Sequence, residues 1–178
     1  LIVALGVVLV AGIAAFLLHR KRRTERLRTQ FGGAEYARAM EKGGGRRLGE
    51  AGLDKRTERV EAFHLRPLAA GDRARFAESW RGVQARFVDG PAGAVTEADQ
   101  LLGDVMSTRG YPVGDFEQRA ADISVDHPLV LENYRKAHEI ALQQTRGQAT
   151  TEDLRQAMVH YRTLFEELVG DPAMAPTT

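Results

Sequence analysis

The chain begins with an uncharged apolar segment and continues with residues whose apolar positions recur at helical spacing. Residues 1–18 contain no charged side chain. As a helix with a rise of about 1.5 Å per residue, this segment would extend about 27 Å, close to the ~30 Å hydrocarbon core of a bilayer. The pattern therefore predicts a single N-terminal transmembrane helix. A cleavable signal peptide is the alternative, although such peptides carry positive charge before their apolar region, whereas here the charge follows it.

A basic segment follows the apolar one directly. Residues 19–31 contain six Lys or Arg side chains and one Glu. Because cytoplasmic flanks of membrane spans carry an excess of Lys and Arg, we expect the rest of the chain to lie in the cytoplasm. A body that faces the cell envelope is the alternative. Four basic side chains are predicted to contact the headgroups of membrane lipid: Arg20, Lys21, Arg22 and Arg23.

Glycines and charge density divide the remainder of the chain. Residues 19–45 are predicted to form a basic juxtamembrane stalk, with a helix break at the glycine pair 32–33 and a linker of three glycines at its end. Residues 46–66 are charge-dense with a thin apolar stripe, which predicts a charged helix. Residues 67–170 follow as a helical bundle, and residues 171–178 as a flexible tail.

Apolar side chains recur every three or four positions within residues 67–170. Phe76 and Trp80 share one helix face, where a core position is favoured over a ligand platform. Thr150 and Asp153 form a close variant of a capping box at the start of the last helix. No stretch after the apolar segment alternates with the period of a strand. The sequence thus predicts an all-α protein in which a single transmembrane helix precedes a bundle of about four core helices.

The sequence contains no complete catalytic, metal or cofactor motif. The absence of cysteine excludes thiol nucleophiles and Cys-ligated zinc. The run from His138 begins like the zinc-protease motif His-Glu-x-x-His but has Leu142 where the second ligand belongs. A di-iron bundle needs Glu-x-x-His, and Glu132 is followed at that offset by Arg135. We therefore expect no catalytic residue, metal ion or cofactor, and neither nucleic acid nor a small-molecule ligand as a partner.

His138 and Tyr161 suggest one alternative function. If the last two helices are antiparallel, their side chains come together at one edge of the bundle. A membrane-anchored enzyme with a site at this edge is the functional interpretation. The structural interpretation is that both side chains find hydrogen bonds where the interior meets water, and it is favoured because an isolated His lacks the partners of a catalytic site.

The connector after residue 109 is richer in aromatic and charged residues than a simple turn requires. Ordered loops of this kind often carry binding surfaces. We expect Asp126 to cap a helix whose first turn contains Pro128. The connector and this helix start are predicted to form an edge that docks another protein, through Tyr111, Phe116, Asp126 and His127.

Three segments, residues 80–89, 109–113 and 121–128, resemble a family of uncharacterised bacterial proteins with one N-terminal transmembrane helix and a helical body. The resemblance covers most of the chain after the apolar segment. It implies the same architecture and no active residues. Together with the apolar segment and its basic flank, this predicts a location in the bacterial inner membrane. The predicted function is a membrane-anchored helical protein-interaction or scaffold module, because a tethered domain meets its partners at a raised effective concentration.

Overall fold

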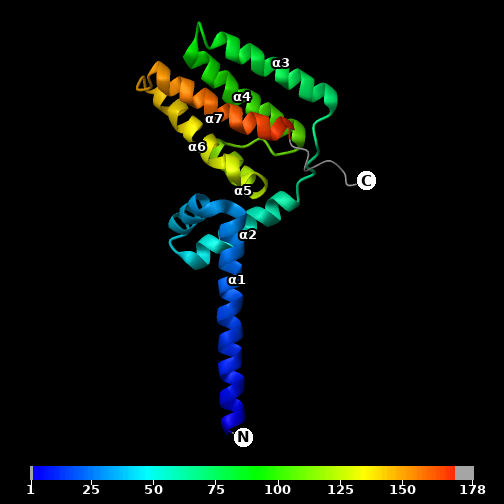
Figure 1. Ribbon diagram of the computed structural model, residues 1–178, viewed down its shortest axis with the longest axis vertical. Helices are drawn as coiled ribbons and strands as arrows, with labels where there is room; N and C mark the ends of the chain where they lie inside the picture. Colours follow the sequence, from blue (N-terminus) through cyan, green and yellow to red (C-terminus); the bar gives the residue numbers. More distant parts are fainter. Residues whose placement is uncertain (1, 171–178) are drawn as a thin grey trace. The chain divides into compact units, whose positions relative to one another are not determined.

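The computed structural model describes the backbone of residues 2–170 and the side chains of residues 12–170. Seven helices and no strand occur in this part of the chain, so the all-α prediction is confirmed (Figure 1). The helices form two compact units, Leu1–Thr57 and Glu58–Thr178, called here the first and second units. The flexible tail predicted for residues 171–178 lies outside the described residues.

The first unit is built from α1 (Ile2–Lys42) and the larger part of α2 (Arg46–Glu61), which is shorter than the predicted helix over residues 46–66. The helical course of α1 is interrupted at Gly32, whose φ of 74° and ψ of 159° suit only a residue without a side chain. This interruption lies at the predicted glycine break. The chain then reverses through the three glycines before α2.

Close backbone contact holds α1 and α2 together in the first unit. A side chain on Gly49 would place its Cβ only 2.7 Å from the carbonyl oxygen of Ala39 and 2.8 Å from the Cα of Met40. The two helices also share a partly buried ion pair, in which Arg56 donates to Glu35 at 2.6 Å. Glycine at position 49 therefore sets the distance between the helices, and the ion pair fixes their register.

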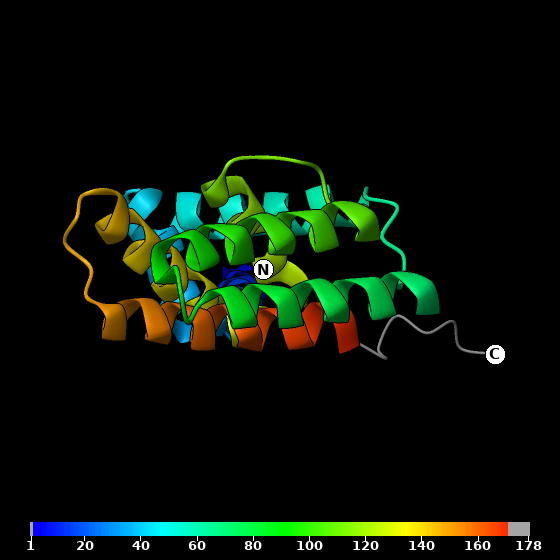
Figure 2. The same cartoon turned by 90° about the horizontal axis from the view of Figure 1, so that it is seen from above.

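The second unit contains five helices after the end of α2. They are α3 (Ala70–Arg86), α4 (Pro91–Arg109), α5 (Phe116–Asp126), α6 (Pro128–Thr145) and α7 (Thr151–Gly170). Helix α7 packs against α6, α4 and α3, and α5 packs against α6 (Figure 2). The predicted helical bundle is confirmed, with α7 as its most central element.

Aromatic and aliphatic side chains fill the interior of the second unit. Trp80 stacks on Phe165 with ring centroids 4.7 Å apart, so it belongs to the core as predicted. One charged side chain is also enclosed. Arg109, at the end of α4, is 1% exposed and donates from Nη1 to the carbonyl oxygen of Leu168 at 2.9 Å. This bond joins the last turn of α4 to the last turn of α7.

The predicted helix caps are confirmed at one end and corrected at another. The Thr150 backbone N–H donates to Asp153 Oδ2 at 2.8 Å, and the Asp153 N–H donates back to Thr150 Oγ1 at 3.2 Å, which is the predicted capping box. By contrast, Asp126 is the last residue of α5, and His127 occupies the cap of α6. The Asp126 side chain instead accepts a hydrogen bond from Tyr111.

The membrane-spanning prediction is not supported. Within the part of the chain that the structure describes, no helix is both long enough and apolar enough to cross a bilayer. The side chains of residues 1–11 lie outside the described set. The finding that no described helix could cross a bilayer contradicts the predicted single-pass location in the bacterial inner membrane.

Candidate functional site

A shallow groove of about 170 Å³ lies on the second unit between α3 and α7. Its apolar lining comes from the end of α3 and the middle of α7. Val159 is 47% exposed, and Phe87 is only partly buried, so the fold leaves apolar surface open here. The α3–α7 groove is lined by Gln84, Phe87, Arg155, Met158, Val159 and Arg162.

The core of the second unit fixes the walls of the groove. The stacked rings of Trp80 and Phe165 hold α3 against α7. Phe87 follows the last residue of α3, and its backbone N–H donates to the carbonyl oxygen of Val83 at 3.2 Å, which keeps the ring beside the helix. The next residue, Val88, is 83% exposed. The apolar surface therefore continues beyond the groove at the end of α3.

Two arginines stand at the rim of the groove, each held by a glutamate of its own helix. Arg155 makes two hydrogen bonds to Glu152, at 2.7 and 2.8 Å, and Arg162 donates to Glu166 at 2.7 Å. The bonds from Arg155 and Gln156 lower the pKa of Glu152 to about 2. The glutamates orient the guanidinium groups and leave other N–H donors facing solvent. The groove can thus accept an apolar side chain next to a hydrogen-bond acceptor.

The predicted docking residues lie elsewhere, and most of them are inside the second unit. Tyr111 is 2% exposed, and its hydroxyl donates to Asp126 Oδ2 at 2.9 Å. Phe116 stacks on His138 with ring centroids 3.5 Å apart. His127 is buried, with Nδ1 3.1 Å from Glu167 Oε1. These contacts join the connector to the bundle. Of the four predicted docking residues only Asp126 is exposed. Docking of a partner through these four residues stays a prediction.

The predicted edge at His138 and Tyr161 contains a polar cluster that the sequence did not reveal. Arg119 of α5 donates to Asp99 of α4 at 3.0 Å, and the pair lies beside Tyr134 and Tyr161. The buried atoms of the cluster that lack a hydrogen-bond partner among the described residues include Asp99 Oδ1, Arg119 Nε and Tyr134 Oη. No sequence motif joins these side chains, because they come from four different helices.

Electrostatics make this cluster a poor acid–base site near neutral pH. Burial, and next the carboxylate of Asp99, raise the pKa of both Tyr134 and Tyr161 well above the usual value, so both hydroxyls keep their protons. Burial lowers the pKa of His138, which favours its neutral imidazole. Among the residues with described side chains, no three His, Asp or Glu are arranged to hold a metal ion.

The basic residues predicted to contact lipid lie on the first unit, where three of them contact other side chains of the protein. Arg23 is paired with Asp54 of α2. Lys21 lies 3.9 Å from Glu25 in an exposed ion pair. Arg20 packs over the Phe16 ring, with its guanidinium carbon 5.8 Å from the ring centre. Arg22 is exposed.

Comparison with known proteins adds no relative to this geometry. The chain matches no protein-family model, no curated protein and no solved structure. The resemblance to a bacterial family therefore stays a prediction, and a function can be inferred only from the residues of the chain itself.

Proposed function

We propose that the protein is a helical protein-interaction module whose α3–α7 groove receives one apolar side chain of a partner. The observation that carries this proposal is an open apolar depression next to two guanidinium groups, each oriented by a glutamate of its own helix. Protein interfaces commonly combine an apolar centre with a polar rim, and arginine is enriched among the residues that dominate binding.

The dimensions of the groove limit the size of the group that it accepts. A cavity of about 150 Å³ is large enough for a benzene-sized group, so about 170 Å³ suits one leucine, methionine or phenylalanine side chain. Burial of such a side chain contributes about 1.5–3 kcal/mol. The rim arginines favour Asp or Glu on either side of it. The expected partner is therefore a short acidic segment with one large apolar residue.

An enzyme with a site near His138 and Tyr161 has less support. The hydroxyl of Tyr161 holds its proton far above neutral pH. His138 is stacked against Phe116. A general base needs both a pKa near the working pH and access to substrate, and neither side chain combines the two.

A displayed library of random peptides tests the interaction proposal. The full chain is expected to select peptides in which an apolar residue lies next to Asp or Glu. Substitution Val159→Asp places a charge in the groove and should reduce binding of the selected peptides about tenfold or more, because it removes the apolar contact. The matched control is Leu142→Asp on α6, since Leu142 is 44% exposed and lies outside the groove.

Two results would contradict the proposal. One is a selection without enrichment of acidic and apolar neighbours. The other is equal binding by the Val159→Asp and Leu142→Asp variants, which would show that the peptides bind a surface other than the groove.

A further inference from the structure

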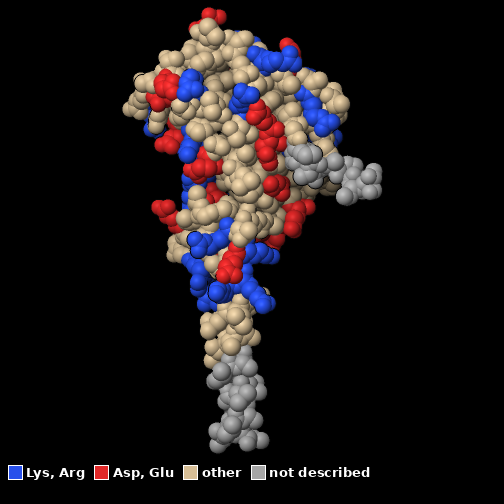
Figure 3. Space-filling model, viewed as in Figure 1, with Lys and Arg blue, Asp and Glu red and all other residues tan. Residues whose placement is uncertain are grey.

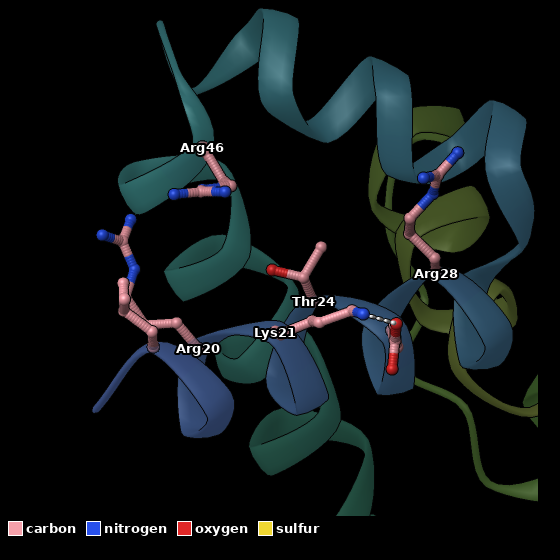
Figure 4. A pocket seen from close by; sticks show the side chains of 7 residues that line it. Arg20, Lys21, Thr24, Arg28 and Arg46 are labelled. Atoms are coloured by element: carbon pink, nitrogen blue, oxygen red, sulfur yellow. Dashed lines mark ion pairs between the residues drawn. The ribbon is translucent and has the colours of Figure 1, made fainter. Parts of the chain in front are cut away.

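A second depression, of about 300 Å³, lies entirely within the first unit and is lined mainly by basic side chains (Figure 4). Most of the lining belongs to one stretch of α1, and one residue comes from the start of α2. We call this depression the basic pocket. Its lining residues are Leu17, Arg20, Lys21, Thr24, Glu25, Arg28 and Arg46.

Hydrogen bonds between the helices bring Arg46 to the pocket. Thr24 and Tyr36 of α1 both donate to Glu50 Oε1, at 2.6 and 2.9 Å. Arg46 lies one helical turn before Glu50, so these bonds place the first residue of α2 beside Thr24. Figure 4 shows Arg20 and Arg46 on the same side of the pocket and Thr24 toward its middle, whereas Arg28 lies at the other end and points away.

The cations of the pocket are less neutralised than their neighbours. Arg23 and Arg26 both pair with Asp54, and Arg56 pairs with Glu35. In contrast, among the described side chains no carboxylate lies within 4 Å of the guanidinium groups of Arg20, Arg28 or Arg46. The fourth basic residue of the pocket, Lys21, lies 3.9 Å from Glu25. Figure 3 shows basic side chains gathered on the first unit next to the uncharged part of α1.

Aromatic rings hold two of these arginines in place. The guanidinium carbon of Arg20 lies 5.8 Å from the centre of the Phe16 ring, and that of Arg28 lies 5.8 Å from the centre of the Tyr36 ring. Such stacking orients a guanidinium group without using its N–H donors. The start of α2 adds the positive end of a helix dipole beside Arg46. Donors and positive charge therefore converge on a space with four basic side chains and a single acidic one, Glu25, which lies beside Lys21.

We propose that the basic pocket binds a phosphate group, with Arg20 and Arg46 as its principal ligands. Guanidinium groups match phosphate oxygens with paired hydrogen bonds, which a lysine-only patch does not provide. Leu17 supplies an apolar wall next to the charges, where the organic part of the ligand rests. A lipid headgroup and a small phosphorylated molecule share this chemistry. The inference is independent of the α3–α7 groove, which lies on the second unit.

The test has two arms and uses the full chain. In the first arm, inorganic phosphate and glycerol phosphate are titrated by calorimetry at constant ionic strength. In the second arm, phosphatidylcholine vesicles carry either phosphatidic acid or, as a control for charge without phosphate, oleate. Binding in the first arm identifies a soluble phosphate as the ligand, and binding only to phosphatidic acid vesicles identifies a headgroup.

Variants separate the pocket from general positive charge. Arg46→Gln is expected to weaken phosphate binding about tenfold, the loss typical of one hydrogen bond between charged groups, and Arg46→Lys to retain part of the affinity. Arg47→Gln is the matched control, because Arg47 is the exposed neighbour of Arg46 and does not line the pocket. Circular dichroism checks that each variant keeps its helices.

Three results would overturn the inference: no binding in either arm, equal losses for Arg46→Gln and Arg47→Gln, or equal binding to oleate and phosphatidic acid vesicles. Failure of the peptide selection at the groove would leave the phosphate result unaffected, since the two sites share no residue.

Discussion

Arg119 of α5 donates a hydrogen bond to Asp99 of α4 at 3.0 Å, inside a bundle whose other ion pairs are mostly on the surface. The side chains of the pair are 15% and 24% exposed. We expect Arg119→Leu to lower the free energy of unfolding by about 1–3 kcal/mol, because the Asp99 carboxylate then loses its charged donor. Urea unfolding of the purified chain measures this loss.

The exposed ion pair of Arg81 and Glu78 provides the control for this prediction. Its atoms are 2.7 Å apart, yet both side chains are about two-thirds exposed. Arg81→Leu should change stability by less than about 1 kcal/mol. If Arg119→Leu and Arg81→Leu have the same effect, the Arg119–Asp99 pair stabilises the second unit no more than a surface pair does.

Alkaline pH should destabilise the second unit through its buried tyrosines. Burial raises the pKa of Tyr134 and Tyr161 in the folded state above the usual value of 10.0. A group whose pKa is raised by folding stabilises the protein fully below its unfolded pKa, and this contribution is lost as the pH rises toward the folded pKa. Stability should therefore fall as the pH rises above about 10.

Tyrosinate absorbance together with urea unfolding tests the alkaline prediction. The Tyr161→Phe variant should lose less stability over the same pH range, because it has one group fewer that must ionise. An unchanged unfolding midpoint in the wild-type chain up to strongly alkaline pH would argue against buried, proton-retaining hydroxyls.

Acid pH should also lower the stability of the second unit, in this case through protonation of His138. Burial against Phe116 lowers the pKa of His138 below its usual value of 6.5. The folded state favours the neutral ring. The contribution of His138 to the free energy of unfolding is therefore fully present above the pKa of the unfolded state, and it is lost as the pH falls through the lower pKa of the folded state. We expect the folded chain to lose stability below about pH 6.5, and less so in His138→Gln. Nuclear magnetic resonance titration of the imidazole, with a midpoint at or above 6.5, would refute this.

Two glycines of α2 give opposite predictions for the same substitution. Gly49→Ala should destabilise the first unit by about 1–3 kcal/mol, because its Cβ would collide with the backbone of α1. A Cβ added at Gly52 would meet no other atom within 4 Å, so Gly52→Ala should stabilise the helix by about 0.5–1 kcal/mol. Thermal unfolding followed by circular dichroism measures both, and a stabilising Gly49→Ala would contradict the close approach of the helices.

Local sequence signals predicted the helices better than they predicted the sites. The capping box at Thr150 and the core position of Trp80 depend on nearby residues and on helical period, which a sequence displays directly. The candidate docking residues Tyr111 and Phe116 look the same in a sequence whether they face solvent or pack inward. Only the tertiary contacts reveal that Tyr111 is buried and bonded to Asp126.

Both candidate sites depend on residues that lie far apart in the chain. Arg46, the first residue of α2, reaches the basic pocket because the chain reverses after α1. Its partner in the pocket, Arg20, lies in the first half of α1. The groove likewise combines Phe87 with Val159. The predicted membrane span is contradicted, because no helix in the described part of the chain is both long enough and apolar enough to cross a bilayer.

The hydrogen bond from Arg109 to the Leu168 carbonyl sets a limit on how far the protein can be shortened. Removal of the final turn of α7 would take away the acceptor and leave an enclosed guanidinium group short of one bond, at a cost typical of an unsatisfied charged donor. Proteolysis or truncation that removes the last turn of α7 should therefore also loosen the last turn of α4, which lies near the middle of the sequence.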